Sequence, residues 1–66
     1  MTVVLNGEER RCSEGWTLAD LVTDLELRGR RIAVEMNRTI IPRDEYATHR
    51  LQPGDEIEIV HFVGGG

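Results

Sequence analysis

The sequence predicts a small α+β domain in which one helix packs across one face of a mixed sheet of four to five strands. Three observations lead to this prediction: an Asn-Gly pair between two β-prone segments, apolar residues at helical spacing, and a final segment in which apolar residues alternate with others. A chain of 66 residues has room for one such domain. We place the domain at residues 1–63 and a glycine tail at residues 64–66.

The first two strands are predicted to form a hairpin around Asn6 and Gly7. Residues 2–6 are mostly β-branched or apolar, and an Asn-Gly pair suits a type I′ turn, which needs positive φ at both central positions. Residues 8–13 form the second arm and are mostly charged. Because charge on an exposed strand discourages further pairing, this arm is expected at an edge of the sheet.

A helix is predicted to begin after Thr17. Thr17 is a typical N-cap, and Asp20 three residues later gives a weaker form of the capping box. Apolar residues then recur at positions i, i+3, i+4 and i+7 and line one face: Leu18, Leu21, Val22 and Leu25. Gly29 predicts the end of the helix, with Arg28 in its last turn near the negative end of the helix dipole.

The second half of the chain is predicted to supply the remaining strands. Residues 32–36 alternate as a strand, Asn37 and Arg38 form a tight turn, and residues 39–41 make a short strand. Residues 43–51 are expected to form a loop with one helical turn, and residues 56–63 the clearest strand. A right-handed crossover from the helix then places the first and last strands parallel in the middle of the sheet, an arrangement known as the β-grasp.

Composition and charge exclude several functional classes. The net charge of -4, from 12 acidic and 8 basic side chains, opposes binding to nucleic acid or to an anionic membrane. All eight basic residues are Arg, so the side chains offer no amine as an acyl acceptor. One cysteine excludes an internal disulfide, and no apolar stretch has the length of a membrane span, so a cytoplasmic location is expected.

Few residues in the domain have the pattern of a catalytic or metal site. His49 and His61 lack ligand spacing, and no Cys-x-x-Cys pair occurs, so no metal is expected. Cys12 is interpreted as a small buried apolar residue, since no His or Lys lies close in sequence to lower its pKa. Adjacent carboxylates diverge in extended structure and are interpreted as solvated surface.

The last strand offers a candidate contact surface. If Ile57 and Ile59 point to the core, Val60 and Phe62 lie on the open face of the sheet, where exposed apolar groups mark contact surfaces. The alternative is that Val60 and Phe62 pack beneath neighbouring strands. Ile40 is a further candidate, although its three-residue segment is too short to fix which face it occupies.

The three terminal glycines suggest a reactive tail. Without Cβ atoms, Gly64, Gly65 and Gly66 can extend through a channel too narrow for side chains and leave the terminal carboxylate accessible. Attack of this carboxylate on the α-phosphate of ATP would release pyrophosphate and give an acyl adenylate, from which a sulfur or amine nucleophile could displace AMP. The chain would supply the acyl group and a partner the catalysis. The alternative is a frayed, idle terminus.

The chain resembles the bacterial sulfur carrier proteins of thiamine biosynthesis, within the ubiquitin-like β-grasp group. The resemblance covers essentially the whole chain and is carried by five segments: LNGE, CSEGWTLADLV, AVEMNRTIIPRDEY, LQPGDEIEIV and FVGGG. It implies that Gly66 is adenylated by a ubiquitin-activating-like adenylyltransferase and becomes a thiocarboxylate that donates sulfur to thiazole synthase, with Gly64 and Gly65 threading the channel. It also implies that the surface around Val60 and Phe62 docks on both partners in turn.

The resemblance to a carrier further implies that the protein is not itself an enzyme, that it binds no cofactor, and that it is a monomer when free. ATP would be consumed by the partner.

Three alternatives stay open. The small subunit of molybdopterin synthase has the same fold, tail and activation with a different acceptor. A ubiquitin-like modifier would transfer Gly66 to lysines, and a non-reactive interaction module would leave the tail idle.

Overall fold

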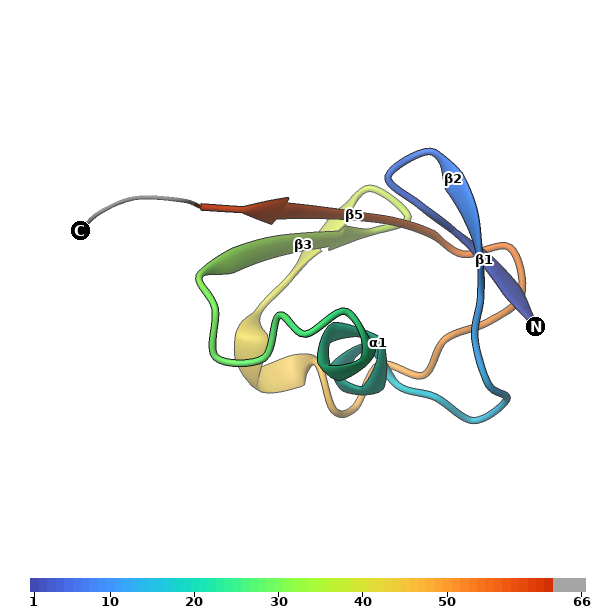
Figure 1. Ribbon diagram of the computed structural model, residues 1–66, viewed down its shortest axis with the longest axis horizontal. Coiled ribbons are helices and arrows are strands. Elements are labelled where there is room, and N and C mark those ends of the chain that lie inside the picture. Colours follow the sequence, from blue (N-terminus) through green and yellow to red (C-terminus); the bar gives the residue numbers. More distant parts are fainter. Residues whose placement is uncertain (63–66) are drawn as a thin grey trace.

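One five-stranded sheet forms a layer of the fold, and helix α1 covers one of its faces in the computed structural model, which describes residues 1–62 (Figure 1). The elements follow in the order β1 (Thr2–Leu5), β2 (Glu8–Arg11), α1 (Leu18–Asp24), β3 (Ile32–Met36), β4 (Thr39–Ile41), the 3-10 turn η1 (Arg43–Glu45) and β5 (Glu56–His61). The strand order across the sheet is β2-β1-β5-β3-β4. Strands β1 and β5 are parallel and the other neighbours antiparallel, which confirms the predicted mixed β-grasp sheet.

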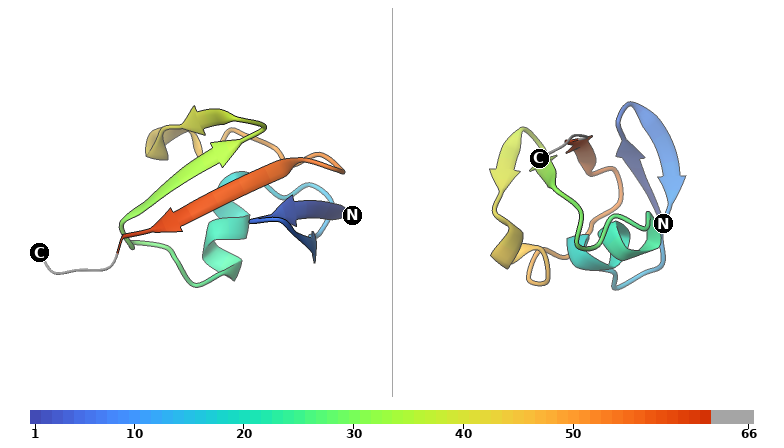
Figure 2. Two further views of the ribbon diagram at one scale, coloured as in Figure 1. Left: turned by 90° about the horizontal axis from the view of Figure 1, so that it is seen from above. Right: turned by 60° about the vertical axis from the view of Figure 1, so that its left-hand side comes forward.

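Strand β5 lies in the centre of the sheet, between β1 and β3 (Figure 2). Its pairing with β3 is the longest in the sheet and runs from Met36 opposite Ile57 to Ile32 opposite His61. Its pairing with β1 is short, because the chain leaves β1 at the Asn6–Gly7 turn. The charged strand β2 lies at one edge, as predicted.

Two hairpin turns flank β5, and each places an asparagine against its backbone. Asn6 and Gly7 have φ of 50° and 83°, as the predicted type I′ turn requires, and Asn37 and Arg38 have φ of 52° and 71°. The Oδ1 atom of Asn6 accepts the N–H of Ile59 at 2.9 Å. This side chain thus replaces the next backbone carbonyl that β1 would have supplied. Asn37 Oδ1 likewise accepts the N–H of Glu56 at 3.0 Å.

Helix α1 begins as predicted but ends earlier. The Asp20 N–H donates to Thr17 Oγ1 at 3.3 Å and the Thr17 N–H donates to Asp20 Oδ2 at 2.8 Å, which completes a capping box. The predicted end at Gly29 is wrong, and Arg28 lies outside the helix, because α1 ends at Asp24.

The early end of α1 is a Schellman motif built without glycine. Glu26 takes the left-handed position with φ of 61°, its N–H donates to the carbonyl of Thr23, and the Leu27 N–H donates to the carbonyl of Val22. The reversal folds Leu27 back against the core, so burial of Leu27 compensates for a conformation that a non-glycine residue adopts at a cost.

The core lies between α1 and the sheet. Its buried residues come from every strand except β2, from α1 and from the connections: Val3, Cys12, Leu18, Leu21, Val22, Val34, Met36, Ile41, Tyr46, Leu51, Ile57 and Ile59. The other face of the sheet has no covering element among residues 1–62, so apolar side chains on it remain accessible.

Candidate functional site

The candidate site begins at the end of β5, where the strand alternates between the core and the open face. Ile57 is 1% exposed, whereas Val60 is 54% and Phe62 53% exposed. This exposure confirms the predicted alternation of the strand, with Ile57 toward the core and Val60 and Phe62 on the open face. Val60 and Phe62 do not pack beneath neighbouring strands, and two large apolar groups in water at the end of one strand have the character of a contact surface.

Ile40 belongs to the same open face. In the sheet register it lies opposite Glu35 of β3, whose neighbours Val34 and Met36 point into the core. Ile40 is 71% exposed, more than any other large apolar side chain among residues 1–62. The structure thus shows that Ile40 lies on the open face of the sheet, which its three-residue segment alone could not determine.

A small hollow of about 80 Å³ joins part of this surface. Ile40 and Val60 line it from β4 and β5, with Ala33 and Glu35 of β3 and Glu58 of β5 between them. Phe62 is not part of the hollow and lies further along the chain. We call Ile40, Val60 and Phe62 the apolar patch.

The sequence reasoning missed the two glutamates of the hollow as site residues. Glu35 and Glu58 are directly opposite each other in the β3–β5 register. Their strand positions alternate with core residues, so their facing was predictable. Their juxtaposition was not, because it depends on which residues of β3 and β5 pair.

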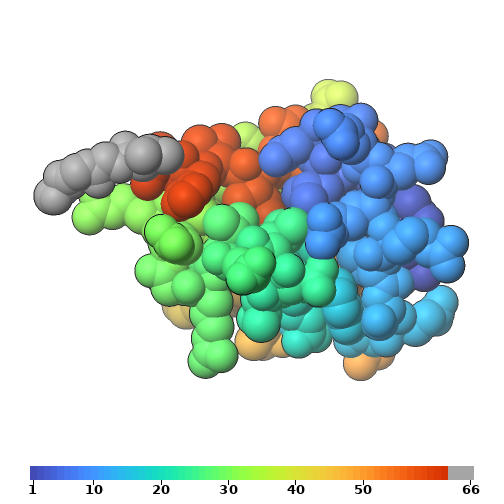
Figure 3. Space-filling model, in the orientation of Figure 1, coloured from blue at the N-terminus to red at the C-terminus, as the bar shows by residue number. Residues whose placement is uncertain are grey.

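The last described backbone contact of the chain lies close in sequence to the glycine tail. The N–H of Phe62 donates to the carbonyl of Arg31 at 2.9 Å, which holds the chain at the end of β5 against the loop between α1 and β3 (Figure 3). The predicted channel-threading residues Gly64 and Gly65 and the predicted attachment site Gly66 lie outside the described residues, as does Val63.

Cys12 is buried, as predicted. Burial raises the pKa of its thiol, and this outweighs the opposing charge of Arg10, which lowers the pKa. A thiol that is both buried and protonated is a poor nucleophile.

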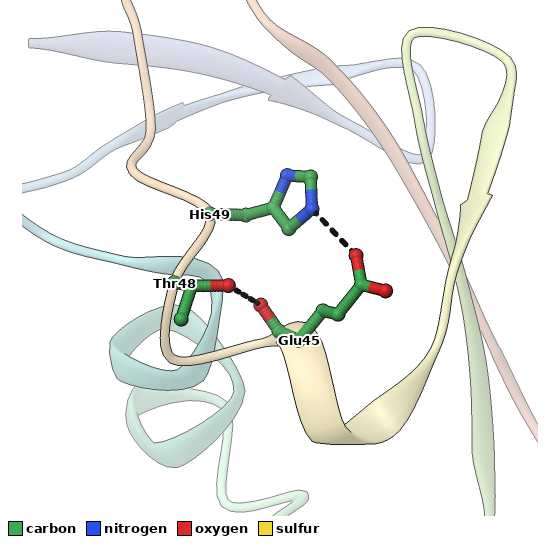
Figure 4. Close-up of polar contacts among 3 residues, drawn as sticks. All are labelled: Glu45, Thr48 and His49. Atoms are coloured by element: carbon green, nitrogen blue, oxygen red, sulfur yellow. Dashed lines mark hydrogen bonds and ion pairs between the residues drawn. The ribbon is translucent and has the colours of Figure 1, made fainter.

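The histidines occupy unrelated positions. His49 Nε2 lies 3.2 Å from Glu45 Oε1, while the Thr48 hydroxyl donates to the Glu45 carbonyl at 3.0 Å (Figure 4). These contacts brace the loop after η1. His61 lies at the end of β5, and residues 1–62 contain no group of three metal-ligating side chains.

A larger cavity of about 310 Å³ lies on the other side of the sheet, between α1, the loop that follows it and η1. Its apolar walls include Val22, Leu27 and Tyr46, and Arg28 and Arg30 also line it. The cavity is separated from the apolar patch by the sheet itself.

Within residues 1–62, no helix combines the length and the apolar character needed to cross a membrane.

Comparisons with known proteins agree over the whole chain. Residues 3–66 match the model of the ThiS family. The chain is 32% identical to the sulfur carrier protein ThiS of Escherichia coli over the full length of both, and 40% identical to that of Bacillus subtilis over 94% of this chain and 96% of the relative.

Two other comparisons extend this agreement. The crystal structure of the thiamine biosynthesis protein ThiS from Geobacter metallireducens superposes over the full length of both chains, with a TM-score of 0.83 and 25% identity. The chain is also 44% identical over its full length to a thiazole synthase of Paramagnetospirillum magneticum, of which it spans one fifth. The chain therefore belongs to the ThiS family.

Proposed function

We propose that this chain carries sulfur on the carboxylate of Gly66. A ubiquitin-activating-like adenylyltransferase catalyses attack of this carboxylate on the α-phosphate of ATP and releases pyrophosphate. A sulfur nucleophile then displaces AMP to leave a thiocarboxylate, which donates its sulfur to thiazole synthase. In this scheme the chain is a cytoplasmic monomer between encounters, binds no cofactor and catalyses no step.

The observation that carries this proposal is the match to the sulfur carriers, which extends to residue 66 and includes the terminal glycines. Among residues 1–62, the cysteine is buried, and the two histidines lie on different segments, one after η1 and one at the end of β5. The reactive chemistry is therefore assigned to a partner that acts on the end of the chain.

The apolar patch is proposed as the surface that both partners use in turn. Ile40, Val60 and Phe62 are exposed on the face of the sheet that no described element covers. One surface used by two partners makes the two complexes mutually exclusive. The thiazole synthase relatives support this pairing, since each includes a segment similar to this whole chain within a longer protein.

The test is intact mass spectrometry after incubation with ATP, the adenylyltransferase of the same organism and a sulfur source. The wild-type chain should gain the mass difference between sulfur and oxygen. Deletion of Gly66 should abolish the gain, and Gly65→Val should strongly reduce it by obstructing the channel. Both variants leave residues 1–62 unchanged, so we expect their free energies of unfolding to stay within about 0.5 kcal/mol of that of wild type.

The outcomes separate the rival functions. A non-reactive interaction module would retain its activity without Gly66. A ubiquitin-like modifier would form adducts in which Gly66 is linked to lysines of other proteins. If the chain lacking Gly66 restores growth of a thiamine-requiring carrier-deficient strain, the proposed sulfur attachment is wrong.

A further inference from the structure

The open face of the sheet carries charge as well as apolar groups, and the two are arranged in rows. Ile40, Glu35 and Glu58 lie side by side across β4, β3 and β5. In the neighbouring row, two positions along β3 and β5, Ala33 lies opposite Val60. The hollow between these rows is therefore lined on one side by Ala33 and Val60 and on the other by Ile40 and two carboxylates.

The two carboxylates are arranged unfavourably for the isolated domain. Like charges directly opposite each other on adjacent strands destabilise a sheet. The ion pairs among residues 1–62 are Arg10 with Asp24 and His49 with Glu45, so neither Glu35 nor Glu58 has a cationic partner there. The remaining residues, 63–66, contain no basic side chain. Among the described residues, this pair therefore takes part in no ion pair.

Ile40 of the apolar patch shares the acidic row, whereas Val60 and Phe62 come after it along the chain. Along β5, Glu58 precedes Val60, and Phe62 follows, so the strand runs from the carboxylates through the apolar residues toward the tail. A partner that matches this order can dock in only one direction. The charge pattern would thereby orient β5 relative to a bound partner.

We infer that the partner surface that docks here combines an apolar side chain, which enters the hollow beside Ile40 and Val60, with arginine or lysine side chains that face Glu35 and Glu58. This inference deepens the proposed docking role and rests on it. It specifies the chemistry of the protein partner: a basic and apolar surface, complementary to an acidic and apolar face. Such complementarity fixes orientation and raises the rate of association.

The experiment measures binding of the wild-type chain and three variants to the adenylyltransferase and the thiazole synthase of the same organism, at low and high salt. In Glu35→Lys/Glu58→Lys both charges of the row are reversed, and the like-charge pair is kept, so the stability of the fold should change little. The control, Glu8→Lys/Glu14→Lys, makes the same change in net charge at exposed residues away from the hollow. Phe62→Asp tests the apolar patch itself.

We expect the reversal at Glu35 and Glu58 to weaken binding to at least one partner about tenfold or more at low salt, and the control less than about twofold. A salt concentration of about 0.5 M should reduce this difference in binding between the two double variants, because salt screens exposed charges.

Equal effects of the two reversals, no effect of either, or tighter binding by the Glu35/Glu58 variant would each overturn the inference. If Phe62→Asp weakens binding and the Glu35/Glu58 reversal does not, the docking face stands and its charge requirement is wrong. If wild type binds neither protein, the docking role and this inference both fail.

Discussion

The two faces of the sheet carry similar apolar side chains and use them differently. Toward α1, Val34 and Ile57 are almost completely buried, whereas one row away on the open face Ile40 and Val60 are more than half exposed. Ile57 and Val60 belong to the same strand, and in β4 the exposed Ile40 precedes the buried Ile41, so a shift of one residue in register would exchange such roles. The difference shows that the sheet carries apolar side chains that do not contribute to the core of the domain.

The first prediction tests this difference by placing a threonine on each face of β5 in turn. Ile57→Thr should lower the free energy of unfolding by about 2–4 kcal/mol, because it removes buried apolar volume and introduces a hydroxyl into the core. Val60→Thr keeps the β-branched shape in water and should change it by less than about 0.5 kcal/mol. Guanidinium denaturation measures both. Similar losses for the two variants would contradict the assignment of the faces.

The second prediction concerns the helix that closes the core face. Glu26→Gly should raise the free energy of unfolding by about 0.5–1 kcal/mol, since glycine adopts the left-handed conformation at the end of α1 without the cost of a Cβ atom. Glu26→Ala keeps that cost and serves as the control. Thermal or chemical unfolding of the two variants gives the measurement, and a gain for alanine equal to that for glycine would rule out the explanation.

The smallest effect is expected on the open face. Glu35→Gln removes one of two opposed charges and should stabilise the domain by about 0.3 kcal/mol at low salt. The exposed loop residue Glu14 provides the matched control, Glu14→Gln. A gain that appears at position 35 alone, and that salt removes, would show that the open face is not optimised for stability. A loss at position 35 would argue against repulsion between Glu35 and Glu58.

Local patterns predicted most of the fold. The Asn6–Gly7 turn, the capping box at Thr17 and the alternation around Ile57 each encode their structure within a few residues, and the structure confirms all three. The end of α1 was mispredicted because Glu26 occupies a position where glycine is the usual signal.

The arrangement of the candidate site depended on contacts between distant residues. The alternation of β5 predicted the exposure of Val60 and Phe62, but Ile40 needed its pairing with Glu35 to fix its face. The opposition of Glu35 and Glu58 likewise follows from the β3–β5 register, which no local pattern states. The roles of Gly64, Gly65 and Gly66 stay predictions, which the mass-spectrometric experiment tests.

The central position of β5 has a mechanical consequence. A pull on the chain along the axis of this strand would act on a strand that is bonded to β3 on one side and to β1 and the Asn6 side chain on the other. Such a force loads these hydrogen bonds together, in shear. Were the tail attached to an edge strand and pulled across the sheet, the pairs would peel apart one at a time. The described sheet is therefore arranged to resist a force that is applied along β5.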